Sequence, residues 1–137
     1  MIPAVFDTNV IVSGMLTASG PPGQIVEWLV QGTIRAALDD RIISEYERVL
    51  HYPQLNLPHA EVAILIERIC RTGTNVVTEP KYADLRLPHK DDLPFAQCAL
   101  TATAPLVTGN VRHFPSSVMG SVPVVSPGEY VQVISRS

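Results

Sequence analysis

Residues 2–9 read IPAVFDTN, a short apolar run followed directly by three polar side chains. A run of this kind, bounded by polar residues, is typical of a strand buried in a parallel sheet. It predicts a first strand from Ile2 to Phe6 whose carboxyl end carries Asp7. In an open parallel sheet, ligands bind outside the carboxyl ends of the strands. Asp7 is therefore the first candidate for a functional residue.

The rest of the chain alternates short apolar runs with helical periodicity, the pattern of a parallel sheet with crossover helices. Residues 78–93 are polar and contain two prolines, which predicts a surface loop. The fold class is α/β, a three-layer α/β/α sandwich around a central, mostly parallel sheet of about five strands. Further strands are predicted over residues 33–38, 76–77, 106–108 and 122–125, and helices over residues 24–30, from 39 or 40 to 50, 59–71, 93–103 and in a short turn from 126.

Composition indicates one soluble domain spanning residues 1–137. The chain is 46% hydrophobic and 17% charged, an ordinary globular balance. It shows neither an export leader nor an apolar run of 18 residues, so we expect a cytoplasmic protein without a membrane partner. Cys70 and Cys98 each stand alone in an apolar helical pattern, which predicts small core residues in a reducing compartment. The net charge of −3 weighs mildly against a nucleic-acid binder.

Acidic and polar residues recur where strands end or helices begin. Taken singly, Asp7 and Asn110 are ordinary turn residues, and Asp92 fits a helix N-cap. Glu45 is ordinarily a solvated helix residue, and periodicity barely separates it from Glu47.

Together these residues say more. Several carboxylates converging on one sheet edge repel one another unless a cation lies between them. Hard cations such as Mg²⁺ and Mn²⁺ take carboxylate ligands near phosphates, and they lower the pKa of bound water. The joint pattern therefore predicts a divalent-metal site.

Four segments carry a resemblance to a known family over nearly the whole chain, from Ile2 to about Val133. They are Asp7-Thr8-Asn9-Val10, Ser44-Glu45-Tyr46, Asp91-Asp92 with Phe95 and Ala99, and Val107-Thr108-Gly109-Asn110 with Phe114. In order and spacing they resemble the PIN domain, and most closely its toxin branch, related to virulence-associated-protein C toxins. The resemblance implies a metal-dependent endoribonuclease that hydrolyses RNA.

Carried over by position, the resemblance makes Asp7, Glu45 and Asp92 the catalytic acids and the ligands of Mg²⁺ or Mn²⁺. Asp91 either assists them or faces solvent. Many members have aspartate where this chain has Asn110, which still offers a carbonyl oxygen. This substitution leaves open whether one or two metal ions bind.

Several further residues are candidates around these acids. Thr8, Asn9, Thr108 and, more weakly, Ser13 would orient the carboxylates. The alternative for the first three, hydrogen bonding at strand ends, is about equally good. Lys90, Arg112 and His113 would contact phosphates at the mouth of the cleft, or would be solvated loop charges. The expected partners are an RNA substrate, a second copy of the chain and a cognate antitoxin.

Two other classes of function compete with this reading. The first is a non-catalytic RNA- or protein-binding module on the same fold, which is suggested by Asn110 in place of an aspartate. Other phosphate-handling α/β domains are the second. A phospho-receiver needs an acidic pair after the first strand and a lysine after the last, and the chain provides neither. A haloacid-dehalogenase-type phosphatase needs a second aspartate where Asn9 stands.

Overall fold

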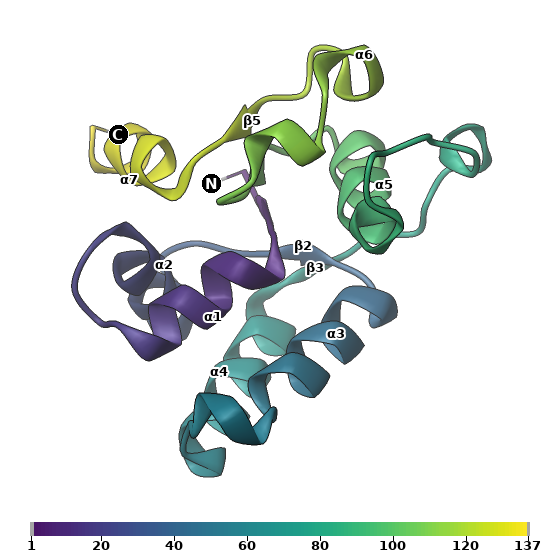
Figure 1. Cartoon of the computed structure of the whole chain (residues 1–137). Coiled ribbons are helices and arrows are strands. Elements are labelled where there is room, and N and C mark those ends of the chain that lie inside the picture. Colours follow the sequence, from purple (N-terminus) through teal and green to yellow (C-terminus); the bar gives the residue numbers. More distant parts are fainter. Residues whose placement is uncertain (1, 137) are drawn as a thin grey trace.

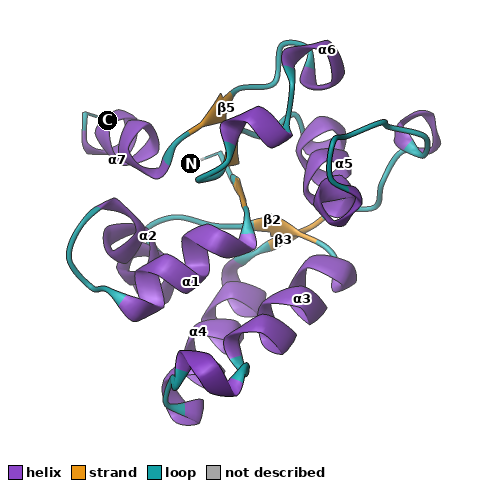
Figure 2. Ribbon diagram, viewed as in Figure 1, coloured by secondary structure: helices purple, strands orange, loops and turns teal. Residues whose placement is uncertain are grey.

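Five short parallel strands form the centre of the protein. The computed structural model describes residues 2–136. Its strands are β1 (Val5–Phe6), β2 (Ala37–Leu38), β3 (Thr74–Asn75), β4 (Leu106–Val107) and β5 (Val124–Val125). β1 pairs with β4 and β4 with β5, while β2 pairs with β3. A parallel bridge between Ala4 and Ala36 joins the two groups, giving the order β3-β2-β1-β4-β5. Figure 2 shows the short strands in orange among the purple helices.

Helices cover both faces of this sheet, so the expected α/β/α architecture is confirmed. α5 packs on β1, β2 and β4 and also touches α3 (Figure 1). On the other side, α1 packs on α2 and α3, and both of these pack on α4. The helices are α1 (Thr8–Leu16), α2 (Pro21–Gln31), α3 (Asp40–Leu50), α4 (His59–Thr72), α5 (Leu93–Ala102), α6 (Ser116–Met119) and α7 (Pro127–Ser135), with 3₁₀ turns at Pro53–Leu55, Pro80–Tyr82, Lys90–Asp92 and Val111–His113.

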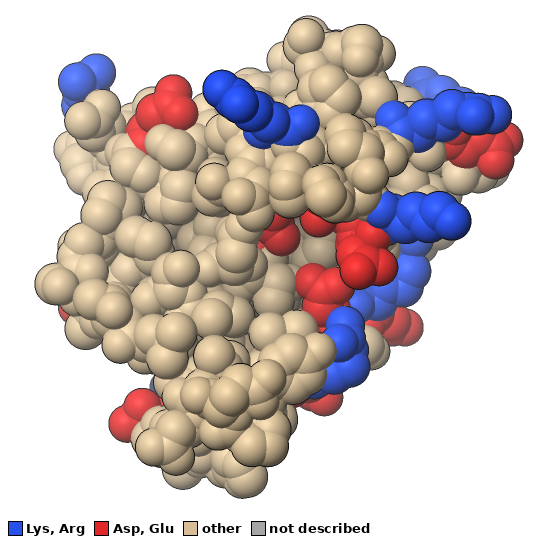
Figure 3. All heavy atoms as spheres, in the orientation of Figure 1, with Lys and Arg blue, Asp and Glu red and all other residues tan. Residues whose placement is uncertain are grey.

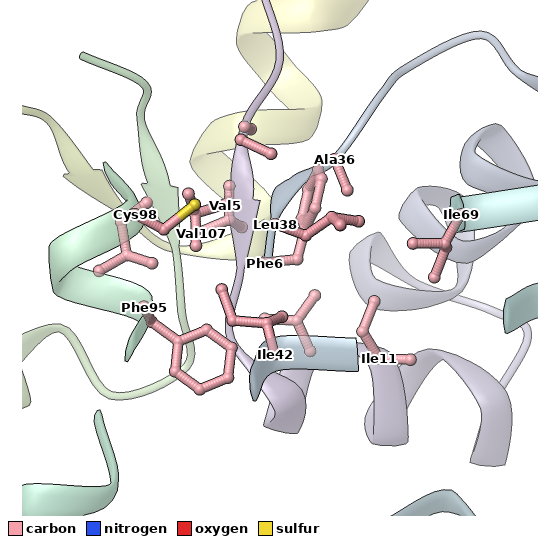
Figure 4. Close-up of a cluster of buried hydrophobic side chains, with 14 of the residues drawn as sticks. Val5, Phe6, Ile11, Ala36, Leu38, Ile42, Ile69, Phe95, Cys98 and Val107 are labelled. Atoms are coloured by element: carbon pink, nitrogen blue, oxygen red, sulfur yellow. The ribbon is translucent and has the colours of Figure 1, made fainter. Parts of the chain in front are cut away.

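The core lies where β1 and β4 meet the helices. Both strands are apolar at every position and fully buried, as expected for strands covered on two faces. Phe6 on β1 packs edge-on against Tyr130 of α7, with ring centroids 5.5 Å apart. Side chains from α3, α4 and α5 close the same cluster (Figure 4). Each fully buried large apolar side chain contributes about 1.5–3 kcal/mol to stability, so the end of β1 is held firmly.

A close helix–helix contact fixes the position of α1. Gly14 faces the start of α2, where a Cβ atom would overlap the carbonyl oxygen of Pro22 and a methyl group of Val26. The contact is therefore possible only because glycine lacks a side chain. It sets the approach of α1, whose first turn follows Asp7 directly.

The sequence analysis missed α1 altogether. Val10, Ile11 and Val12 are β-branched and favour strands locally, and the segment has few polar residues to mark a solvent face. Packing against α2 and α3 overrides that preference.

Other boundaries also differ from those predicted. α2 begins at Pro21 rather than residue 24, and α7 is a full helix rather than a short turn. The third strand comprises residues 74–75 rather than 76–77, although the Val76 amide still bonds to Leu38. The predicted loop 78–93 contains two 3₁₀ turns, and α6 was not predicted. Cys98 is buried as expected, but Cys70 is exposed because it lies one position beyond the buried face of α4. Within residues 2–136, none of the helices could span a membrane.

Candidate acidic site at the carboxyl edge of the sheet

Asp7 lies at the end of β1 with its carboxylate turned into the protein. Its backbone amide bonds to the Val107 carbonyl at 2.9 Å, which continues the β1–β4 pairing by one residue. The hydroxyl of Thr108, at the end of β4, donates to Oδ2 of Asp7 at 2.7 Å. Only 6% of Asp7 is exposed. The side chain is thus fixed by two neighbouring strands.

Burial raises the pKa of Asp7, and two more carboxylates raise it further. The Thr108 hydrogen bond opposes this by stabilising the ionised form, but Asp92 and Glu45 both repel the charge. Coulombic repulsion between carboxylates falls off with distance. The structure therefore brings together the three acids that the sequence analysis selected.

Glu45 enters the site from α3. The next residue, Tyr46, is fully buried and its hydroxyl donates to the carbonyl of Phe6, immediately before Asp7. This bond ties α3 to the end of β1. The carboxylate of Glu45 accepts a hydrogen bond from the hydroxyl of Thr8. Glu45 therefore belongs to the site, whereas Glu47 lies on the exposed side of the helix.

Asp92 reaches the site from the start of α5. Its Oδ2 lies 3.1 Å from Nδ1 of His113, and the side chain is 14% exposed. Burial raises the pKa of Asp92, while His113 beside it has the opposite effect. The imidazole of His113 also lies against that of His89, with ring centroids 4.0 Å apart. In this structure His113, a candidate phosphate contact, lies against an acid.

A cleft of about 430 Å³ opens beside one of these acids, Glu45, whereas Asp7 and Asp92 are not part of its lining. One wall is α1 and the other is α3. Its lining comprises Thr8, Asn9, Val12, Ser13, Glu45, Arg48, Val49, Tyr52 and Asp91. Asp and Glu atoms gather in a hollow of this face, with Lys and Arg atoms alongside (Figure 3). Asp91 therefore lines the cleft, whereas Asp92 is held by His113.

The remaining predicted residues surround this cleft. Asn9 accepts a hydrogen bond from the Gly109 amide at 3.3 Å, which links α1 to the turn after β4. The backbone amide of Asn110 donates to the Thr108 hydroxyl, and its side chain is exposed. Lys90 and Arg112 are exposed in the 3₁₀ turns on either side of α5 and β4.

Three residues of the site were not singled out from the sequence as site residues. Tyr46 was named only as part of the segment that carries the family resemblance, and Arg48 and Tyr52 were not considered. The signal for the last two was available, because residues 45, 48, 49 and 52 follow the i, i+3, i+4, i+7 spacing of one helix face.

The donor set of the site fits a hard divalent cation. Carboxylate oxygens are the ligands that Mg²⁺ and Mn²⁺ prefer, and a cation would relieve the repulsion that raises the pKa of Asp7. As they stand, no three His, Cys, Asp or Glu side chains within residues 2–136 are close enough to share one ion. Each acid is paired instead with Thr108, Thr8 or His113. Binding of one ion by all three acids therefore requires their side chains to move.

The sheet order, the helices on both faces and the acidic carboxyl edge define a three-layer α/β protein with a candidate metal site. The family model of the PIN domain matches residues 3–112, well over half of the chain and including all three acids. The chain belongs to the PIN-domain family, as the sequence motifs indicated. PIN domains are generally nucleases, and the family typically uses divalent metal ions. The search of curated proteins found no match.

Proposed function

We propose that this protein is a Mg²⁺- or Mn²⁺-dependent endoribonuclease. The observation that supports this most is the convergence of Asp7, Glu45 and Asp92 from three separate elements, close enough for two of them to raise the pKa of the third. Such an arrangement costs stability in the metal-free protein, because burying like charges together is unfavourable. Acids arranged in this way are typical of functional sites.

Each acid has a residue that holds it. Thr108 fixes Asp7, Thr8 fixes Glu45, and His113 pairs with Asp92. Together the acids would hold the cation, which when bound stabilises charge on a phosphodiester and lowers the pKa of water. Asn110 offers a carbonyl oxygen rather than a carboxylate at the fourth position, so we propose at least one ion at this site.

The biological role follows from the branch of the family that the sequence resembles. We propose that the protein is the toxin of a toxin–antitoxin pair, that it acts as a homodimer and that a cognate antitoxin binds it. A small protein encoded beside this one, whose co-expression relieves growth inhibition, would support this role. Absence of growth inhibition on expression of the protein alone would contradict it.

Cleavage of a mixed RNA pool tests the enzymatic proposal. The wild type should cleave RNA with Mg²⁺ or Mn²⁺, and Asp7→Asn should lose this activity. Asp84→Asn is the matched control, because it makes the same chemical change at an exposed acid that is not among the residues lining the cleft. Equal cleavage by the wild type and Asp7→Asn would contradict the assignment of Asp7.

A second candidate is a non-catalytic RNA- or protein-binding module. The exposed Asn110 favours it, as does the pairing of each acid with a neighbouring side chain. Calorimetric titration with Mn²⁺ separates the two candidates. Binding that is lost in Asp7→Asn supports the nuclease, and absence of binding at millimolar concentration supports the module.

A further inference from the structure

Arg48 and Tyr52 form one end of the acidic cleft, and the roles proposed above do not use them. Both line the same 430 Å³ cleft as Glu45. Nη1 of Arg48 donates to the hydroxyl of Tyr52 at 2.6 Å, and Nη2 lies 3.9 Å from Glu45. The Arg48 side chain is 60% exposed. A guanidinium carries five N–H donors, so it can still bind an anion from solvent.

The backbone of Tyr52 is fixed on both sides. Its amide bonds to the Val49 carbonyl at 3.1 Å, and its carbonyl accepts from the Leu55 amide at 3.0 Å. Pro53, which follows, begins a 3₁₀ turn. An aromatic ring on a fixed backbone loses little conformational freedom when a planar group stacks on it. Tyr52 therefore provides a preorganised aromatic side chain within the cleft.

The charges of the cleft show what a ligand there must satisfy. Glu45 and Asp91 would repel a phosphodiester, and Arg48 is the one Lys or Arg among the described residues that line it. An anion entering next to the acids is therefore attracted at the Arg48 end. An aromatic ring beside an arginine is a combination that recurs where proteins bind single-stranded nucleic acids. Pockets of about 300–1,000 Å³ hold small organic ligands, a range that includes this cleft.

We propose that Arg48 and Tyr52 form a subsite for one nucleotide of a single-stranded RNA, next to the bond that is cleaved. Arg48 binds a backbone phosphate and Tyr52 stacks on the base. Single strands are specified because bases in a duplex stack on one another and are not available to an aromatic side chain. This subsite rests on the proposed nuclease function, since it places the strand beside Glu45, one of the three proposed catalytic acids.

Binding of a fluorescein-labelled single-stranded RNA oligonucleotide tests the subsite. Asp7→Asn protein in EDTA serves as the background, so that the RNA stays intact during anisotropy measurements. Tyr52→Ala should raise Kd about tenfold, the effect of losing one base stack. Tyr52→Phe keeps the ring and should bind within about twofold of the background. If Tyr52→Ala binds as the background does, base stacking is refuted.

Arg48→Ala should raise Kd and lower the slope of log Kd against log salt by about 0.7, as expected for one phosphate contact on a single strand. The matched control is Arg71→Ala, which removes the same charge from the exposed face of α4. An equal loss in both arginine variants would show a general charge effect and overturn the phosphate contact. A duplex of the same sequence that binds as tightly, with the same sensitivity to Tyr52→Ala, would overturn the single-strand specificity.

Steady-state cleavage separates this proposal from the one on which it rests. If the wild type cleaves RNA and Tyr52→Ala leaves KM unchanged, the subsite is wrong and the nuclease stands. If the wild type does not cleave RNA but the Tyr52 and Arg48 variants lose binding, the nuclease is wrong and the RNA-binding subsite stands. Circular dichroism and thermal melting of each variant confirm that the comparisons are between folded proteins.

Discussion

Asp39 and Asp92 occupy the same position, directly before a helix at the carboxyl edge of the sheet, yet their carboxylates are used differently. Asp39 caps α3 by accepting hydrogen bonds from the amides of Arg41 and Ile42, and it pairs with the Arg41 guanidinium at 2.7 Å. Asp92 begins α5 but bonds to His113 instead. Asp7, at the start of α1, likewise bonds to Thr108. Capping contributes about 1 kcal/mol, and neither Asp7 nor Asp92 uses its side chain for it.

The region around Asp39 also contains a cleft, of about 510 Å³. The charge of Asp39 is compensated by the Arg41 guanidinium, 2.7 Å away. Arg41 also donates to Gln97 at 2.7 Å, and Gln97 donates to the Tyr82 carbonyl at 3.0 Å. Around Asp7, by contrast, burial raises the pKa of that carboxyl group, and the nearby Asp92 and Glu45 raise it further. Cleft size therefore does not distinguish the two regions. The difference is that the Asp39 carboxylate is paired with a guanidinium, whereas the Asp7 carboxylate is held by a hydroxyl and repelled by two further acids.

The largest effect that would test this contrast is on catalysis. Glu45→Gln should lower the RNA cleavage rate about a hundredfold or more, because changes to residues that merely support metal ligands already cost 10- to 100-fold. Asp39→Asn preserves a good helix cap and should cleave at the wild-type rate. Cleavage rates are measured under saturating Mn²⁺. Equal loss of activity in the two variants would contradict the difference assigned to the two regions.

Thr108 tests whether the acids depend on their hydrogen-bond partners. Thr108→Val removes the bond to Asp7 and should weaken Mn²⁺ binding by about tenfold to a hundredfold. Thr108→Ser keeps the hydroxyl and should bind like the wild type. Isothermal titration gives both affinities, and an unchanged affinity in Thr108→Val would show that Asp7 needs no support from β4.

Gln97 tests the other region. Gln97→Leu removes partners from Arg41 and from the Tyr82 carbonyl, so the free energy of unfolding should fall by about 1–3 kcal/mol. Mn²⁺ affinity should stay at the wild-type value, because the network lies outside the acidic cleft. Urea denaturation measures the stability. A variant that kept its stability and lost metal binding would reverse the roles assigned to the two regions.

The smallest expected effect is a pH-dependent difference in melting temperature. The pKa of Asp7 is raised above 3.8 in the folded protein, so folding favours the protonated form. The resulting stabilisation is fully present below the pKa of Asp7 in the unfolded chain. It is lost as the pH rises through the pKa of Asp7 in the folded protein. In EDTA, Asp7→Asn should therefore gain melting temperature relative to the wild type between about pH 4 and about pH 7. Added Mn²⁺ should reduce that gain, and a gain that shrank with rising pH in EDTA would contradict the origin assigned to the shift.

Periodicity was enough to predict the regular helices. The segments that became α4 and α5 have apolar residues at helical spacing with clear ends, and their boundaries agree to within about one residue. α1 was missed because its β-branched residues favour a strand locally and its conformation depends on packing against α2. Strand lengths were overestimated because an apolar run does not show where hydrogen-bond pairing stops.

The place of Asp7 followed from one rule of topology, that parallel strands put their carboxyl ends at a single edge. The choice of Glu45 and Asp92 came from the resemblance to the PIN domain. Thr8 and Thr108 were expected to orient the carboxylates, but the acid that each one holds did not follow from the sequence. The pairing of Thr8 with Glu45 and of His113 with Asp92 joins residues far apart in the chain. Sequence position also suggested a cap for Asp92, and only the three-dimensional arrangement shows that its carboxylate is used otherwise.

The packing of Gly14 against α2 affects the geometry of the acidic site. Any side chain at this position would force α1 away from α2, and α1 carries Thr8 and Asn9 in its first turn. A displacement of about 1 Å in a catalytic arrangement can cost a factor of about 100 in rate. The absence of a side chain at Gly14 thus limits how far Asp7, about two turns earlier in the chain, can depart from its position in the site.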